Sequence, residues 1–108
     1  MRQALVENHG VEAGFIYEYS DGTFQFEYHE DYVLDPTTTA ISLTLPKQYA
    51  PFWSDHLFPF FCGLLAEGTT RAMQCRQLQI DEEDSFGLLL ATGADTIGGV
   101  SVLKPRWL

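Results

Sequence analysis

The side chains that could do acid–base chemistry in this sequence are few and scattered. Its three histidines are His9, His29 and His56, and histidine is the side chain that titrates nearest neutral pH. None has a Cys, Ser or Asp partner at a spacing typical of a catalytic group. Asp55 adjoins His56, but neighbouring residues on a helix point in different directions. We therefore predict a protein that is not an enzyme, with a small enzyme using His56 or Asp95 as the alternative.

A glycine-rich segment, residues 93–99 with the sequence GADTIGG, has the composition of a phosphate-binding loop. Such a loop is followed by Lys-Ser/Thr and lies between a strand and a helix. Here that dipeptide is missing and the expected order is helix, turn, strand. We interpret the segment as a tight turn with a close backbone approach, and we predict no cofactor.

Two further groups of residues could hold a metal ion. Cys62 and Cys75 fall in predicted helical segments without another Cys or His at ligand spacing, so we expect two small buried thiols. The acidic run Asp81–Asp84 is typical of a solvated helix start, where carboxylates interact favourably with the helix dipole. No metal site is predicted.

Composition narrows the class of protein. The chain has 108 residues, of which 45% are hydrophobic and 14% aromatic, so we expect one folded domain over residues 1–108. A net charge of −9 disfavours direct binding of nucleic acid and of anionic membranes. No stretch approaches the roughly 18 apolar residues that span a bilayer. The first ten residues hold no long apolar run, and we expect a cytoplasmic protein.

The first part of the chain predicts an antiparallel sheet. Phe24–Tyr28 alternates aromatic and polar residues, the pattern of a strand with one buried face. An Asp-Gly turn precedes it, which suits a tight hairpin. The other predicted strands are Arg2–Glu7, Val11–Tyr19, Ile41–Leu45 and Ile97–Leu103.

Helical patterns dominate the middle of the chain. Residues 29–35 could form one helical turn, and helical character is expected to begin near Phe52–Asp55. The main helix starts at Pro59, because proline is tolerated in a first turn, and places Phe60, Phe61, Leu64 and Leu65 in the core.

Gly68 is expected to stop that helix in a left-handed conformation, and Thr69 or Thr70 to cap the next one, which runs to Leu78. A last helix spans Ser85–Thr92. The predicted fold is α+β: a small antiparallel β-sheet or partly open barrel of about five strands, packed with about three short helices.

Three motifs occur in order along the chain: ISLTLP at residues 41–46, FFCGLLAEG at residues 60–68 and GADTIGGV at residues 93–100. Together they resemble the N-terminal subdomain of HipA-type serine/threonine kinase toxins, and the resemblance covers essentially the whole chain. It implies a single domain of that kind. The ATP-binding and catalytic segments of such kinases are not in these 108 residues. The sequence therefore resembles the separate HipS-type antitoxins of HipBST toxin–antitoxin systems.

This resemblance implies a function and partners. A HipS-type protein would bind a HipT-type serine/threonine kinase and inhibit it, while a HipB-type protein supplies the DNA-binding part of a larger complex. The alternative is a structural subdomain that completes a HipA-type kinase without inhibiting it.

We expect a partner to meet Trp53 and the turn formed by Glu67, Gly68, Thr69, Thr70 and Arg71. Tryptophan is the side chain most enriched at the energetic centre of interfaces, although Trp53 could equally cover the core. Two positions depart from the family pattern. Ala66 replaces a usual proline, and Thr69 stands where some separate members have a large aromatic, so a plug of the kinase cleft at Thr69 is not expected.

Overall fold

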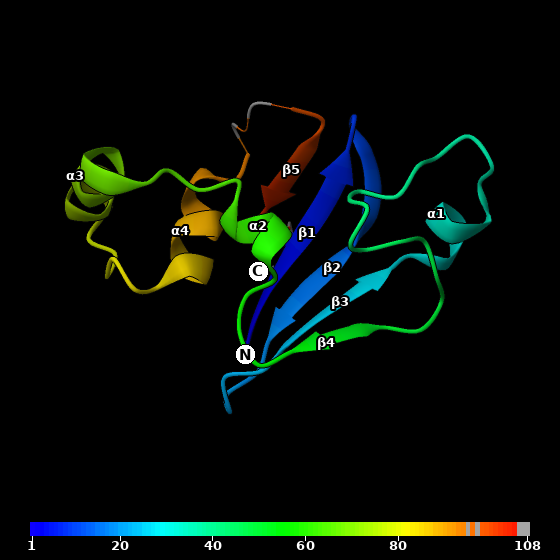
Figure 1. The fold of residues 1–108 in the computed structure, drawn as a ribbon, viewed down its shortest axis with the longest axis horizontal. Helices are drawn as coiled ribbons and strands as arrows, with labels where there is room; N and C mark the ends of the chain where they lie inside the picture. The colour runs from blue at the N-terminus through cyan, green and yellow to red at the C-terminus, as the bar shows by residue number, and fades with distance from the viewer. Residues whose placement is uncertain (95, 97, 106–108) are drawn as a thin grey trace.

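The computed structural model describes residues 1–94, 96 and 98–105, which form an open antiparallel sheet with four helices (Figure 1). The strands lie in the order β4-β3-β2-β1-β5. They are β1 Arg2–Asn8, β2 Val11–Glu18, β3 Phe24–Tyr28, β4 Phe52–Ser54 and β5 Val100–Leu103. The helices are α1 Glu30–Leu34, α2 Pro59–Cys62, α3 Gly68–Leu78 and α4 Ser85–Thr92. The predicted α+β class is confirmed, with four described helices instead of about three.

The first three strands form the predicted meander. The turn between β1 and β2 has positive φ angles at His9 and Gly10, and the turn before β3 has one at Gly22. The Asp21 carboxylate accepts hydrogen bonds from both the backbone N–H and the hydroxyl of Thr23, which fixes that turn. Local turn chemistry therefore sets the register of the hairpins.

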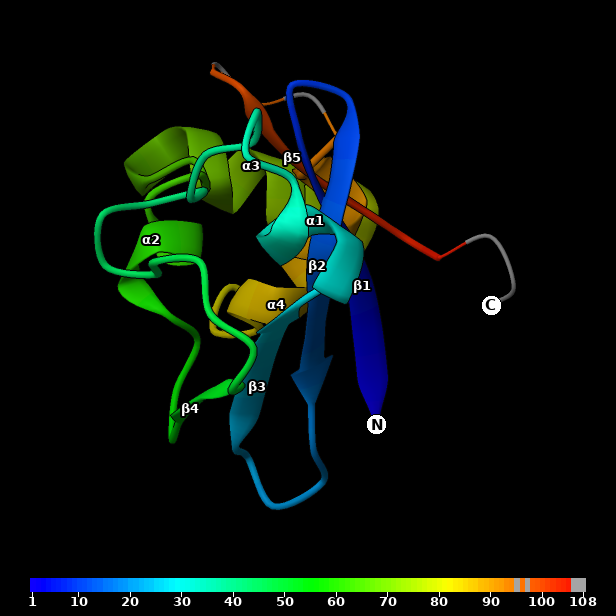
Figure 2. The same ribbon diagram turned by 90° about the vertical axis from the view of Figure 1, so that its right-hand side faces the viewer.

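The helices pack on one face of the sheet (Figure 2). Alternate residues of β1, β2 and β3 point to this face, where they meet aromatic side chains of the helices. Three ring pairs join the layers: Phe24 with Phe86 of α4, Phe26 with Phe61 of α2, and Tyr28 with Tyr32 of α1.

The strand predicted over Ile41–Leu45 is wrong. Ser42 and Leu45 form an isolated bridge across a tight turn, and Leu43 at its tip is fully exposed. The alternation arises because Ile41 and Leu45 are both buried, at the two ends of the turn. The Tyr28 hydroxyl accepts a hydrogen bond from the Ile41 N–H and donates one to the Leu45 carbonyl. One side chain therefore satisfies the backbone groups that a neighbouring strand would otherwise bind.

The prediction that a helix begins near Phe52 is also wrong, because β4 forms there and pairs with β3. Phe52 faces the core beside Phe26, and Trp53 faces the opposite side of the sheet. The sheet therefore has five strands as predicted, but one of them is β4 and not the segment Ile41–Leu45.

One ion-pair cluster joins the two layers. The Arg2 guanidinium binds the Glu18 carboxylate at 2.6 and 2.9 Å and the Asp84 carboxylate at 2.7 and 3.0 Å. Asp84 also caps α4 by accepting the Gly87 N–H, so the predicted helix with an acidic start is confirmed over Ser85–Thr92. The cluster therefore connects β1, β2 and the first turn of α4.

The end of the chain is described in part. The predicted final strand forms over Val100–Leu103. Asp95, Ile97 and Trp107 lie outside the described residues. Within the described part of the chain, no helix is both long and apolar enough to cross a membrane.

Candidate functional site

The connection between α2 and α3 carries most of the residues predicted to meet a partner. Phe61 and Leu65 are buried and anchor it to the core, as predicted, whereas Phe60 and Leu64 are half-buried. After α2, the N–H groups of Leu64 and Leu65 bond carbonyls three residues back, which tightens the chain into a turn. The segment that follows is extended and leads to the first turn of α3.

Gly68 has the predicted left-handed backbone, with φ +61, but its place in the fold differs. It is the first residue of α3 and does not end α2, which stops at Cys62. The residue at the N-cap is Glu67, and no side chain closes the cap, so capping by Thr69 or Thr70 is wrong. The reason is that α2 is a single turn, ended by the backbone turn after it.

Arg71 has a role within the chain. Its guanidinium donates to the Glu82 carbonyl at 2.6 and 3.1 Å, and to the Ser85 hydroxyl at 3.1 Å. These bonds attach α3 to the loop that leads into α4. No local pattern predicts this link, because Arg71 and Ser85 are 14 residues apart.

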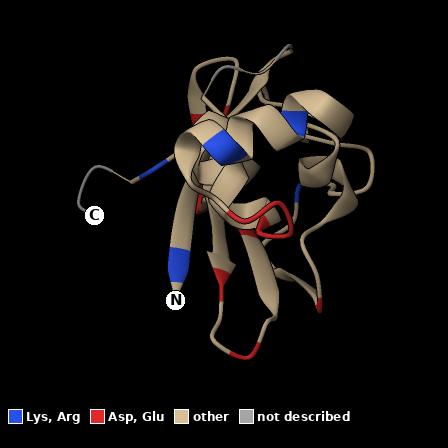
Figure 3. Cartoon of the chain, turned by 90° about the vertical axis from the view of Figure 1, so that its left-hand side faces the viewer, with Lys and Arg blue, Asp and Glu red and all other residues tan. Residues whose placement is uncertain are grey.

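The remaining predicted residues of the turn, Glu67, Gly68, Thr69 and Thr70, are exposed. Two basic positions lie on α3, and the acidic loop at residues 81–84 follows it (Figure 3). The turn therefore presents small and acidic groups beside a surface of mixed charge.

A groove adjoins the turn. It has a volume of about 630 Å³ and lies between the α2–α3 connection, α3 and α4. Its lining is mostly small or apolar, and includes Leu64, Ala66, Leu78 and Ala91. Gln74 also lines it, and the Gln74 Oε1 atom is buried without a hydrogen-bond partner among the described residues.

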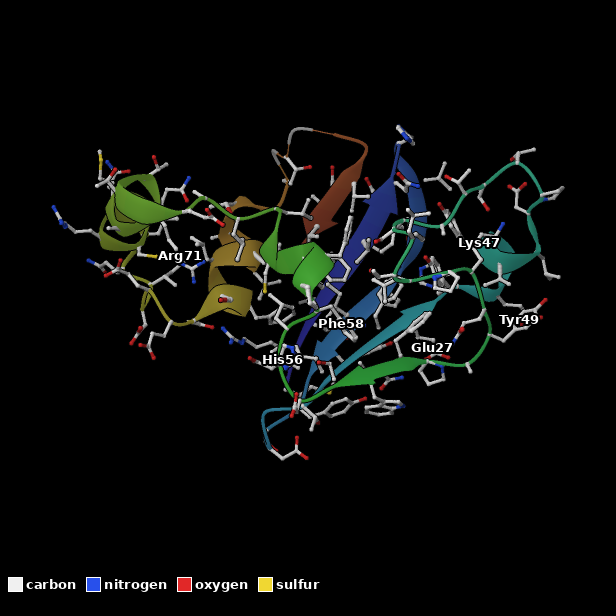
Figure 4. The ribbon with its side chains drawn as sticks, viewed as in Figure 1. Glu27, Lys47, Tyr49, His56, Phe58 and Arg71 are labelled. Carbon is white, nitrogen blue, oxygen red and sulfur yellow. The ribbon has the colours of Figure 1, made fainter. Side chains whose placement is uncertain are left out.

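Trp53 lies elsewhere. It is 61% exposed and stacks on Tyr19, with ring centroids 5.8 Å apart, so it does not cover the core. Trp53 belongs to β4, whereas Arg71 belongs to α3, and the two elements lie in separate parts of the molecule in both ribbon views (Figures 1 and 2). Figure 4 shows Arg71 at the α3 end of the molecule. The structure therefore does not bring the two parts of the predicted interface together.

The histidines lie apart from one another. The His9 N–H donates to the Gly99 carbonyl, and the His9 ring lies against Gly99. His29 packs edge-on against Phe15. His56 contacts Asp55 at 2.7 Å, with 71% and 89% of the two side chains exposed. An exposed pair of this kind lacks the enclosed environment in which catalytic groups are tuned.

The two thiols differ. Cys75 is buried as predicted, but Cys62 is exposed, which corrects the expectation of two buried thiols. Partial desolvation nevertheless raises the pKa of the Cys62 thiol above its ordinary value, which disfavours the reactive thiolate. Among the described residues, no group of three or more His, Cys, Asp or Glu side chains could hold a metal ion.

A family comparison decides what kind of domain this is. The model of the HipA N-terminal domain family matches residues 4–103. The chain belongs to the HipA N-terminal domain family. A solved structure of the N-terminal domain of HipA toxin superposes with a TM-score of 0.76 at 31% identity. That match covers 100% of this chain and 96% of the other.

Two relatives of this HipA N-terminal domain differ in length. An uncharacterised protein of Haemophilus influenzae is 35% identical over 106 residues, which are 98% of this chain and 95% of the relative. The putative kinase Y4mE of Sinorhizobium fredii is 34% identical over 82 residues, which are 76% of this chain but only 20% of the kinase. The matching domain of HipA is its N-terminal, non-catalytic one, which is compatible with a protein that is not an enzyme.

Proposed function

We propose that this HipA N-terminal domain is an antitoxin-like module that binds a HipT-type serine/threonine kinase and inhibits it. The observation that carries the proposal is the contrast between the two relatives. The domain fills almost the whole Haemophilus protein, but one fifth of a putative kinase. Because the same kind of domain occurs within a putative kinase and as a separate protein, we infer that the separate form retains the surface that contacts the kinase.

The exposed turn Glu67–Thr70 and the adjoining groove are the proposed kinase contact. Two features support this choice: Leu78, which lines the groove, is 46% exposed, and all four residues of the turn beside it are exposed. A groove lined by apolar side chains together with Gln77 and Thr92 suits a partner segment that brings an apolar side chain and a hydrogen-bonding group. Trp53 would form a second, separate contact.

The test is co-expression with a HipT-type kinase from the same genome. We expect growth to be rescued and a complex to persist in gel filtration. Leu78→Arg should abolish both, because it places a charge in the groove. Leu34→Arg is the matched control, since Leu34 is 60% exposed on α1, away from the groove. If the kinase remains toxic and no complex forms with the unmodified chain, the proposal is wrong.

The alternative is a domain that completes a kinase without inhibiting it. The same complex would form, so binding alone does not separate the two functions. Phosphorylation by the purified kinase does: we expect this chain to lower the rate, and an unchanged or raised rate would favour the alternative.

We extend the proposal to a larger complex in which a HipB-type protein contacts DNA. The net charge of −9 supports this division of roles, because phosphate contacts depend on Lys and Arg. The domain alone should not retard duplex DNA in a gel, and a mixture with the HipB-type protein and the kinase should.

A further inference from the structure

A row of aromatic side chains crosses the face of the sheet opposite the helices. Tyr17 stacks on Tyr19 with ring centroids 6.3 Å apart, and Tyr19 stacks on Trp53 at 5.8 Å. The planes of the rings within each pair are within 26° and 27° of parallel. Trp53 is 61% exposed and the tyrosines are half-buried, so the row presents ring surface to solvent.

A carboxylate is held beside this row. The Tyr19 hydroxyl donates to Gln25 Oε1, and Gln25 Nε2 donates to Glu27 Oε1 at 3.2 Å. The register places Gln25 opposite both Tyr17 and Trp53, with Glu27 two residues further on the same face. Figure 4 shows Glu27 on this part of the sheet. Burial raises the pKa of Tyr17, and the nearby Glu27 carboxylate raises it further.

The basic side chains whose contacts the structure describes are engaged elsewhere. Arg2 binds Glu18 and Asp84, and Arg71 binds the loop before α4. Lys47 donates to carbonyl groups of the segment after α1. Among the described ion pairs, none involves Glu27. The row therefore combines ring faces with a negative charge that no described cation neutralises.

We propose that the row formed by Tyr17, Tyr19 and Trp53, with Glu27 beside it, is a docking surface for an arginine-bearing segment of a partner protein. A guanidinium group is planar, stacks on aromatic faces and pairs with carboxylates, so it matches both features. Lysine carries the charge but lacks the planar group. The inference shares Trp53 with the proposed kinase contact and to that extent rests on the proposed function, but it names the chemistry recognised by Trp53 and concerns the face of the sheet opposite the groove.

Two other occupants fit less well. Nucleic acid bases also stack on aromatic rows, but their phosphates would meet Glu27 and a chain of charge −9. A purely apolar partner would bury the Glu27 carboxylate without a cation, which is costly.

The test uses the full chain and peptide probes, and needs no kinase. The first probe is an acetylated five-residue peptide with arginine at its second and fourth positions. The second probe has citrulline at both positions, which keeps the shape and removes the charge, and the third has lysine. Two-dimensional NMR of the isotope-labelled protein should show shifts on β2, β3 and β4 with the arginine peptide, weaker ones with lysine and none with citrulline.

Variants locate the contact. Trp53→Ala and Glu27→Gln should each weaken arginine-peptide binding about threefold or more, and together about tenfold, as expected for exposed cation–π and ion-pair contacts. The matched controls are Glu82→Gln and Glu83→Gln, two exposed carboxylates in the loop between α3 and α4, which should leave binding unchanged.

Three outcomes would overturn the inference. The first is equal weakening by the control variants, which would mean that net charge alone attracts the peptide. The second is equal binding of the citrulline peptide. The third is tighter binding of a 12-nucleotide oligothymidine, which would make the row a base-stacking surface. Loss of kinase binding with arginine binding intact would reject only the proposed function.

Discussion

Replacing Asp84 by alanine tests how α4 is joined to the sheet. Asp84 accepts the Gly87 N–H at 3.0 Å as the N-cap, and its carboxylate binds the Arg2 guanidinium at 2.7 and 3.0 Å. An aspartate cap contributes about 1 kcal/mol. The ion pair adds about 0.5 to 1 kcal/mol, since 39% and 34% of the Arg2 and Asp84 side chains stay exposed and solvent screens them. We expect Asp84→Ala to lower the free energy of unfolding by about 1.5 to 2 kcal/mol.

The variant Asp84→Asn separates the two contributions. Asparagine caps a helix as well as aspartate does, but it carries no charge, so only the ion-pair part of about 0.5 to 1 kcal/mol should be lost. Urea denaturation measures both variants, and the midpoint should fall while the slope stays the same. Equal losses for the two variants would refute the capping argument, and no loss in either would refute the whole account.

The pH dependence follows from the same contact. Hydrogen bonds from Arg2 hold the pKa of Asp84 below its ordinary value, against the opposing effect of burial. A lowered pKa means that the folded state binds fewer protons, so the stabilisation is present above the unfolded pKa of about 3.9 and is lost as the pH falls through the folded one. The difference between wild type and Asp84→Asn should be constant near neutral pH and shrink below about pH 4. A difference that grows on acidification would contradict the assignment.

Three further predictions concern the core and the thiols. Tyr28→Phe should cost about 2 kcal/mol in urea denaturation, because it leaves two buried backbone groups at the ends of the Ile41–Leu45 turn unpaired. Gly14→Ala should cost about 3 kcal/mol or prevent folding, since a Cβ would lie 2.2 Å from a backbone oxygen of β3; a stable variant with an unchanged circular dichroism spectrum would contradict this. A thiol reagent should label Cys62 alone in the folded protein, faster as the pH rises, and Cys75 only in urea; early labelling of Cys75 would show that α3 is not packed as described.

Local patterns predicted the parts of the fold that local chemistry determines. The bounds of α4 follow from Asp84 as the cap and Gly93 after the last turn, and the structure confirms them. The alternation of Phe24–Tyr28 predicted β3 correctly. In each case the residues that set the ends of the element lie within or beside it.

The prediction of a strand at Ile41–Leu45 was wrong because alternating apolar residues indicate which side chains are buried. They do not indicate whether the backbone pairs with another strand. Its two buried ends are satisfied by the hydroxyl of Tyr28, which is 13 residues from Ile41. The strand around Trp53 was missed for the opposite reason: it has only three residues, and its pairing with β3 is what makes it a strand. Neither result was available from a window of neighbouring residues.

The candidate site shows the same division. Exposure of Glu67–Thr70 and the left-handed Gly68 agree with the turn that the sequence predicted. The engagement of Arg71 with the loop before α4, and the row that joins Trp53 to Tyr19, depend on residues distant in sequence. The sequence alone therefore predicted the exposed turn, but not the contacts that Arg71 and Trp53 make with residues distant in the chain.

The position of β1 affects how the domain is made in the cell. β1 lies between β2 and β5, and Leu5 pairs with Leu103, so the second edge of the first strand is completed by the last one. While a ribosome is still making the middle of the domain, that edge offers unpaired N–H and C=O groups to any neighbouring chain. Premature termination after α4 would leave the edge open permanently. Such a fragment would expose a sheet edge of the kind that pairs with other chains and aggregates.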